Sequence, residues 1–197
     1  MEPLSNSEVS ITEQYRESLK KVLDHYLRPL VGDADSNLRI MSVGCAFGFE
    51  AEPLLKTFPN ATYTGIDINT DEIAGAKEIN ADLDGKCVFE TADARKKSAF
   101  NNRPWDIVVV RHPQVLGSTR DSNLEKDWAL IMENCISALD KEGVLFVSTD
   151  TEVERKQILE YINKHKDGIK IVTDEQNIHP RKRAVHKDSF VIIGKKV

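Results

Sequence analysis

Residues 39–50 read RIMSVGCAFGFE and carry the clearest indication of the fold in this chain. Its first five residues predict a buried strand, and the small residues that follow predict a tight turn into a helix. Such a turn lets a ligand lie against the backbone, because glycine has no Cβ to collide with it. The dinucleotide fingerprint GxGxxG would need glycines where Ala46 and Phe49 stand. The spacing that fits is GxAxG, beginning at Gly44 and ending at Gly48, and a tight turn without a ligand is the alternative.

The rest of the chain alternates short apolar runs with helical stretches. Strands are expected at 38–43, 62–67, 86–90, 106–110 and 144–148, with helices at 47–57, 70–80, 95–101, 123–139 and 151–164. This alternation is typical of a parallel sheet wrapped by helices. Residues 169–173 and 189–194 are two strand-like runs with no helix between them, so they are expected to pair as an antiparallel hairpin. The sequence therefore predicts five βα units followed by a hairpin.

An amphipathic helix is expected before the first strand. Residues 10–29 place apolar side chains at spacings of three and four, which predicts a helix that ends before Pro29. We expect one compact domain, in which the helix and turn at 1–37 pack on a core formed by residues 38–197.

Two carboxylates follow the next two predicted strands. Asp67 lies 19 residues after Gly48, where a carboxylate can accept hydrogen bonds from both hydroxyls of a ribose. Asp93 follows the third strand, where an adenine amino group could be read. Each could instead cap a helix. Together with the glycine turn, the two favour an adenosine-containing cofactor.

With these motifs the sequence resembles the class I S-adenosylmethionine-dependent methyltransferase family, over residues 38–195. Residues 42–48 resemble its glycine-rich first motif, 65–67 its ribose-binding second and 92–94 its adenine-contacting third. Residues 105–110 and 141–146 resemble its fourth and fifth strands. The resemblance implies an α/β, doubly wound, seven-stranded sheet in the order 3-2-1-4-5-7-6, with strand 7 antiparallel and helices on both faces. It also implies that S-adenosylmethionine (SAM) binds residues 38–197 at the carboxyl ends of the strands.

The resemblance implies a set of cofactor contacts. They are Ser42, Gly44, Cys45, Ala46, Gly48, Glu50, Asp67, Ile68, Asp93, Ala94 and Arg111. The family often has an acidic residue where Ser42 stands, which helps to hold the ammonium group of SAM. Residues 42–53, which include Glu50, also resemble the first motif of chemotaxis-type protein-glutamate methyltransferases. Methylation of a protein carboxyl group therefore stays an alternative.

The residues after the fourth strand are expected to face the methyl acceptor. Methyl transfer needs a well-positioned nucleophile, and a base only if that nucleophile must lose a proton. The chain reads Arg111-His112-Pro113-Gln114 here. It lacks the Asn-Pro-Pro-aromatic motif of enzymes that methylate exocyclic amines of bases or glutamine amides. His112 is a candidate general base and Arg111 a candidate clamp for a carboxylate or phosphate; alternatively, both only shape the cofactor pocket.

Composition excludes several other classes of protein. The 197 residues carry a net charge of −5, which argues against a protein that coats nucleic acid. Three cysteines without CxxC spacing argue against a disulfide framework or a zinc site, and no metal ligands are expected. No apolar stretch is long enough for a membrane span and no secretory signal is visible, so we expect a cytoplasmic protein without a membrane partner. Trp105 and Trp128 are expected to be structural.

One local charge imbalance bears on the acceptor. Residues 176–197 carry six Lys or Arg against Asp188 alone. The basic loop at 179–187 could hold a phosphate-bearing or nucleic-acid substrate, or simply be a solvated loop. The sequence thus predicts a SAM-dependent methyltransferase acting on a small molecule. The alternatives are a protein or RNA methyltransferase and a non-catalytic SAM-binding module, and the oligomeric state is left open.

Overall fold

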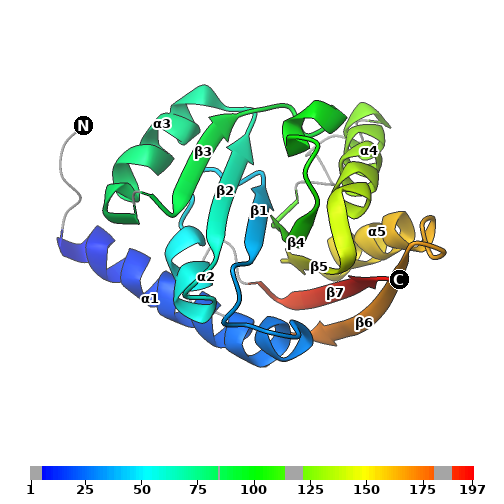
Figure 1. Cartoon of the computed structure of the whole chain (residues 1–197), viewed down its shortest axis with the longest axis horizontal. Helices are drawn as coiled ribbons and strands as arrows, with labels where there is room; N and C mark the ends of the chain where they lie inside the picture. Colours follow the sequence, from blue (N-terminus) through cyan, green and yellow to red (C-terminus); the bar gives the residue numbers. More distant parts are fainter. Residues whose placement is uncertain (1–5, 84, 114–121, 180–187) are drawn as a thin grey trace.

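The computed structural model describes residues 6–83, 85–113, 122–179 and 188–197. A seven-stranded sheet in the order β3-β2-β1-β4-β5-β7-β6 forms its centre (Figure 1). The strands are β1 (Arg39–Val43), β2 (Thr62–Asp67), β3 (Cys87–Thr91), β4 (Trp105–Arg111), β5 (Leu139–Thr149), β6 (Ile169–Gln176) and β7 (Phe190–Lys196). Strands β1 to β5 pair in parallel, and β7 is antiparallel to both β5 and β6. The expected α/β fold and its strand order are confirmed.

Five α-helices of the described residues flank the sheet. They are α1 (Asn6–Val22), α2 (Ala51–Thr57), α3 (Thr70–Ile79), α4 (Ser122–Ala138) and α5 (Glu152–Asn163). Local side chains start two of them. Asn69 accepts hydrogen bonds from the first turn of α3, and Thr151 forms a capping box with Glu154 at the start of α5. None of the helices in these described ranges is long and apolar enough to cross a membrane.

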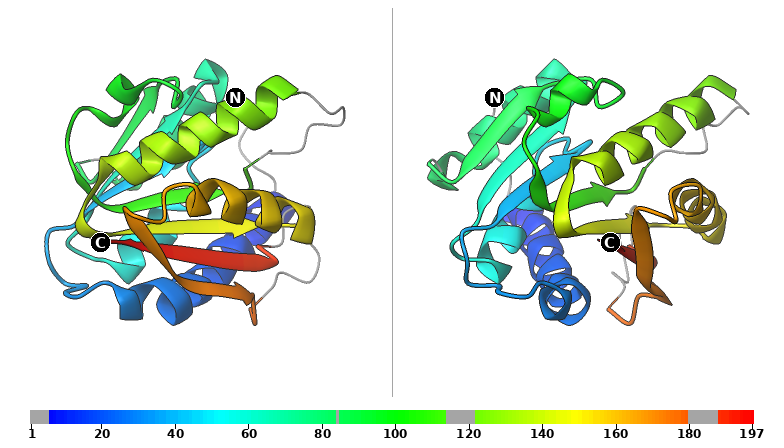
Figure 2. Two further views of the ribbon diagram at one scale, coloured as in Figure 1. Left: turned by 90° about the vertical axis from the view of Figure 1, so that its right-hand side faces the viewer. Right: turned by 45° about the vertical axis from the view of Figure 1, so that its right-hand side comes forward.

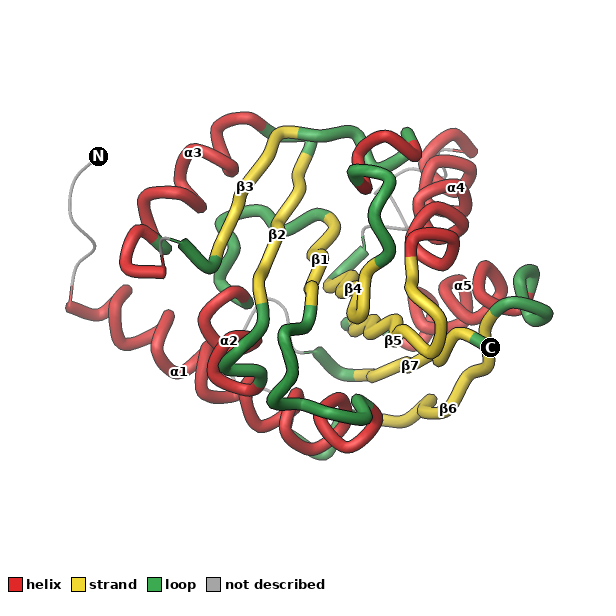
Figure 3. Tube along the Cα trace, viewed as in Figure 1, coloured by secondary structure: helices red, strands yellow, loops and turns green. Residues whose placement is uncertain are grey.

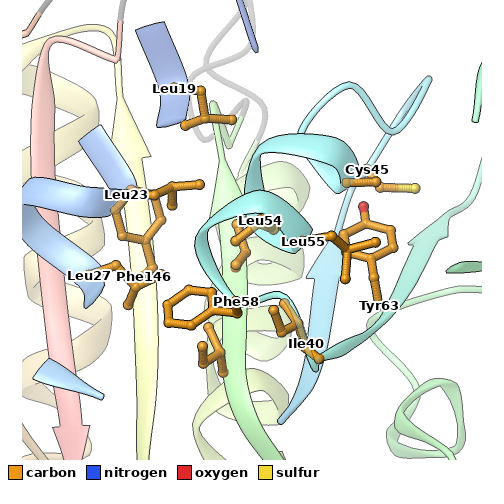
Figure 4. Packing of buried hydrophobic residues seen from close by; sticks show 14 of the residues in the cluster. Leu19, Leu23, Leu27, Ile40, Cys45, Leu54, Leu55, Phe58, Tyr63 and Phe146 are labelled. Carbon is orange, nitrogen blue, oxygen red and sulfur yellow. The ribbon is translucent and has the colours of Figure 1, made fainter. Parts of the chain in front are cut away.

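The helices cover both faces of the sheet (Figures 2 and 3). Strand side chains alternate between the faces, so Ile107 and Val109 pack with α1, α2 and α3, whereas Val108 and Val110 pack with α4 and α5. Figure 4 shows part of the first cluster, in which leucines of the N-terminal helix meet α2 and the strands. The cores on the two faces fix the strand ends from which the functional loops begin.

The structure corrects the expected bounds of several elements. The N-terminal helix does not end before Pro29: after Val22 it continues as a π-helical turn (Leu23–Leu27) and a 3-10 turn (Arg28–Leu30). Pro29 is tolerated because the start of a new turn does not need its missing N–H. The helix expected at 95–101 is a 3-10 turn, Lys97–Phe100, followed by a left-handed residue.

The starts of α2 and β5 also differ from the prediction, because the local sequence pattern does not mark them. The helix expected from residue 47 begins at Ala51, since left-handed conformations at Gly44, Ala46 and Gly48 first carry the chain over the strand ends. Strand β5 begins at Leu139 rather than at residue 144. The polar residues of its first half hide it from a search for apolar runs.

Candidate active site

A cavity of about 820 Å³ lies at the carboxyl ends of β1, β2 and β4 and beside the loop after β3. Its volume is within the range of small-molecule sites. Many of the residues predicted from the sequence line it: Gly44, Cys45, Ala46, Glu50, Asp67, Ile68, Asp93, Ala94, Arg111 and His112. Ser42 and Gly48 are not part of this lining. The cavity therefore joins the predicted cofactor motifs to the predicted acceptor edge.

The two glycines of the first turn have different tasks. Both are left-handed, with φ of +69° at Gly44 and +64° at Gly48. A Cβ on Gly44 would meet nothing within 4 Å, whereas a Cβ on Gly48 would meet the Phe89 ring at 2.4 Å. Gly48 is thus needed for packing against the core. Gly44 leaves open space beside the backbone, as a closely approaching ligand requires.

Glu50 is a carboxylate set into the cavity wall. It is only 5% exposed, and its Oε1 accepts hydrogen bonds from Ser42 Oγ at 2.7 Å and Tyr63 OH at 2.9 Å. Burial and the nearby Glu50 raise the pKa of Tyr63 well above its usual value, so its hydroxyl remains a donor. No cation of the described residues forms a hydrogen bond or salt bridge with Glu50, and the charge of Arg111 acts on it only through space. Ser42, which is not part of the cavity lining, thus orients Glu50 through its hydrogen bond.

Asp67 is held rigidly at the end of β2. Its Oδ2 accepts from the backbone N–H of Ala46 at 3.0 Å, and its Oδ1 accepts from that of Asn69 at 2.9 Å. Each carboxylate oxygen can accept more than one hydrogen bond. Asp67 can therefore bind a further pair of donors without giving up these backbone contacts.

Asp93 is engaged by a neighbouring arginine. Arg95 donates from Nε to Oδ1 at 2.8 Å and from Nη2 to Oδ2 at 3.0 Å, and its Nη1 reaches Asp127 at 2.9 Å. The hydrogen bonds from Arg95 lower the pKa of Asp93. The carboxylate expected to read adenine is thus part of an ion-pair network between the β3 loop and α4.

Arg111 is buried in a second network at the end of β4. Its Nη2 lies 2.7 Å from both oxygens of Asp188, and its Nη1 donates to the hydroxyl of Tyr15. Asp188 is 2% exposed and also accepts from Ser148 Oγ at 2.5 Å. Burial alone would raise the pKa of Asp188, but the charges and hydrogen bonds of Arg111 and His112 together outweigh burial and hold this pKa well below its usual range. The Arg111 guanidinium therefore already forms hydrogen bonds with side chains of the protein.

His112 lies between two carboxylates. Its Nε2 is 3.1 Å from Asp188 Oδ1 and its Nδ1 is 3.1 Å from Asp150 Oδ1. Burial opposes the charge on the ring, yet hydrogen bonds to Asp150 and Asp188 raise the pKa of His112 above its usual value. Its backbone is left-handed, with φ of +50°, a conformation uncommon outside glycine. The surroundings favour the imidazolium form.

Comparison with known proteins identifies the family. A sequence model of the methyltransferase domain matches residues 34–189. The chain belongs to the methyltransferase family. This methyltransferase is SAM-dependent, as the glycine turn and the two carboxylates predicted. Comparison of its sequence with curated proteins gives no match.

Solved structures share the fold of this methyltransferase at low sequence identity. An rRNA methylase from Streptococcus thermophilus is 12% identical with a TM-score of 0.61, over 100% of this chain and 99% of that one. A precorrin-6y C5,15-methyltransferase from Geobacter metallireducens is 12% identical with a TM-score of 0.60, over 91% and 87%. A Streptococcus mutans protein assigned as a methyltransferase, in complex with S-adenosylhomocysteine (SAH), is 11% identical with a TM-score of 0.64, over 90% and 97%. At such identities the similarity shows the fold alone.

The sequence did not predict several residues that line the cavity of this methyltransferase. Thr12 and Tyr15 come from α1, and Phe47 and Phe49 from the first turn. Others come from α3, the β3 loop and one face of α4: Glu72, Arg95, Leu124, Asp127, Trp128 and Ile131. Their three- and four-residue spacing on α4 was visible, but the same spacing describes any core-facing helix. Trp128, expected to be structural, lies in the cavity wall, whereas Trp105 is buried.

One candidate feature of the methyltransferase falls largely outside the structure. In the basic loop at 179–187, residues 180–187 lie outside the described residues. Its described ends are anchored, because Asn177 Nδ2 donates to Asp188 O at 2.7 Å and Ile178 N donates to the hydroxyl of Tyr26 at 3.0 Å.

The contribution of His112 to stability should fall as pH rises. Its pKa in the folded protein lies above the value of about 6.5 expected for an unfolded chain. The contribution is therefore complete below pH about 6.5 and is lost as pH rises through the folded pKa. Urea unfolding of wild type and His112→Gln across this range should give a difference that is largest in acid. A difference independent of pH would contradict the two-carboxylate environment.

Proposed function

We propose that this methyltransferase transfers the methyl group of SAM to a small-molecule acceptor at the carboxyl end of β4. The observation that carries the proposal is the continuous cavity of about 820 Å³ from Gly44 to His112, which has the volume for a cofactor and a small acceptor together. When bound, SAM supplies a methyl group on a sulfonium leaving group. The protein's part is then to hold the two reactants in line and to exclude water.

Two carboxylates and one open backbone position hold the cofactor in this proposal. Asp67 accepts hydrogen bonds from the ribose hydroxyls, and Gly44 leaves space for the adenosyl and amino-acid parts. Glu50 faces the ammonium group, so it supplies from position 50 the charge that the family often carries at position 42. The support for this role is that Glu50 is buried and forms no hydrogen bond or salt bridge with a cation among the described residues. A buried charge of this kind favours a cationic ligand group.

Replacing Glu50 by glutamine should weaken SAM binding about tenfold, or about 1.4 kcal/mol. The change keeps the size of the side chain but removes the charge opposite the ammonium group. Titration calorimetry with SAM and with 5′-methylthioadenosine distinguishes a loss at the ammonium group from a general loss of affinity, because 5′-methylthioadenosine lacks the amino-acid part. Its affinity should stay within about twofold of wild type. Equal losses for both ligands would place Glu50 elsewhere in the binding site.

The acceptor end is formed by the β4 terminus and α1. Arg111 donates to Asp188 and Tyr15, so a further carboxylate or phosphate would compete with bonds already made. His112 stays a candidate base, in its neutral form, at a pH above its raised pKa. An acceptor that can attack without first losing a proton, such as a neutral amine, needs no such base.

Methyl-labelled SAM tests the class of acceptor. Cell extract is separated into small molecules, RNA and protein, and each fraction is incubated with the enzyme. We expect label in the small-molecule fraction, and much less label with an Asp67→Ala control when the SAM concentration is near the wild-type Kd. Label in RNA or in protein carboxyl groups would replace the proposal with one of the two alternatives. A cytoplasmic location stays a prediction.

A further inference from the structure

We propose that Asp127 on α4 reads the amino group of the cofactor's adenine, instead of the third-motif Asp93. The inference rests on SAM binding in the cavity described above. It concerns one hydrogen bond, between a carboxylate oxygen and the exocyclic amine of the base.

The hydrogen-bonding capacity of Asp93 is largely used by the protein. Besides the two side-chain bonds, Arg95 donates its backbone N–H to Oδ1 at 3.1 Å, and Lys96 Nζ lies 4.0 Å from Oδ2. Three hydrogen bonds and two cationic neighbours thus surround one carboxylate. An adenine amine would have to displace one of these contacts or use the remaining acceptor site on Oδ2, beside the cationic Arg95 and Lys96 side chains.

Asp127, unlike Asp93, has one carboxylate oxygen that accepts no hydrogen bond from the described residues. Its Oδ2 accepts from Arg95 Nη1 at 2.9 Å, and no other donor among the described residues contacts its carboxylate. Its side chain is 38% exposed and lines the cavity. Arg95 therefore orients Asp127 while leaving an acceptor available at the cavity surface.

The wall around Asp127 suits an aromatic base. Leu124, Trp128 and Ile131 share its face of α4 and line the same cavity, and Ile68, 65% exposed, adds a further apolar surface next to Asp67. If Asp67 holds the ribose, the base extends from there toward this wall. Apolar walls with a single acceptor select a flat heterocycle that carries one amine.

The loop and helix are tied together independently of charge. Asn134, which is 2% exposed, donates from Nδ2 to the carbonyl oxygens of Ala94 at 3.0 Å and Arg95 at 2.9 Å. This contact fixes the β3 loop against α4, so the position of Arg95 relative to Asp127 is built into the fold. The acceptor is therefore preorganised before a ligand arrives.

Binding of SAH and of S-inosylhomocysteine, in which a carbonyl replaces the adenine amine, tests the assignment. Wild type should bind SAH about tenfold to a hundredfold more tightly than S-inosylhomocysteine, which is the range for one hydrogen bond to a charged group. Asp127→Asn should reduce this preference to about threefold or less, because its amide can also donate to the carbonyl. Glu125→Gln, an exposed carboxylate on the same helix outside the cavity lining, should keep the wild-type preference.

Titration calorimetry separates the possible outcomes. A full preference in Asp127→Asn, or its loss in Asp93→Asn alone, would overturn the assignment and return the role to Asp93. An equal affinity of wild type for both ligands would also overturn it. Failure of wild type to bind either ligand would instead contradict the cofactor site itself.

Discussion

Replacing Asp188 by alanine should lower the free energy of unfolding by about 3–5 kcal/mol, the cost of breaking a buried ion pair from one side. The variant leaves Arg111, whose side chain is 6% exposed, without its carboxylate partner. It also removes the acceptor of the Ser148 hydroxyl. Urea unfolding followed by circular dichroism measures the loss. Because many domains are stable by only about 5–15 kcal/mol, the melting temperature should fall by many degrees.

A less buried ion pair gives the matched control for this variant. Asp174 pairs with Arg155 at 2.5 Å, with side-chain exposures of 28% and 21%. Asp174→Ala should cost less, about 1 kcal/mol, because water can solvate the arginine that is left. The double variant Arg111→Met, Asp188→Leu should lose less than Asp188→Ala, since it leaves no unpaired charge. A loss below about 1 kcal/mol for Asp188→Ala would show that Arg111 reaches water.

Asp67→Ala should weaken SAM binding by about tenfold to a hundredfold, or about 1.5–3 kcal/mol. The variant removes a carboxylate that can accept from both ribose hydroxyls and that also accepts from the Ala46 and Asn69 amides. The loss of those amide contacts should loosen the first turn and add to the effect on binding. Titration calorimetry with SAM and SAH measures it directly.

The control for Asp67→Ala is Asp71→Ala. Asp71 is exposed in the first turn of α3 and is not part of the cavity lining. It carries the same charge close by in sequence, so its replacement reports any general electrostatic effect on the ligand. Unchanged SAM affinity in a folded Asp67→Ala variant would remove Asp67 from the ribose site.

Local sequence pattern predicted most of the elements, because burial sets their periodicity. The four consecutive valine and isoleucine residues of β4 belong to a strand covered on both faces, and such a strand is apolar throughout. The order of the strands was not available from periodicity and came from the family resemblance. Strand β5 was too short in the prediction because Asp140, Lys141 and Glu142 extend it through polar residues.

The candidate site was predictable where the interacting residues lie close together in the sequence. The open position at Gly44 and the placement of Asp67 beside Ala46 follow from strand-to-helix turns that are local in sequence. The Arg111–Asp188 pair joins residues 77 positions apart, and Tyr15 lies 96 positions before Arg111. No local spacing encodes such contacts. The capture of Asp93 by Arg95 depends on side-chain conformations that a motif does not specify.

The position of β7 has a consequence for how the protein is made. It is the last strand in the order of the described chain, yet it lies between β5 and β6. During synthesis, residues 144–149 therefore emerge long before Phe190–Lys196, their partner in the sheet. An unpaired apolar strand edge is a site for contact with other chains. We therefore expect this edge of β5 to be open to contact with other chains until β7 inserts and brings Asp188 to Arg111.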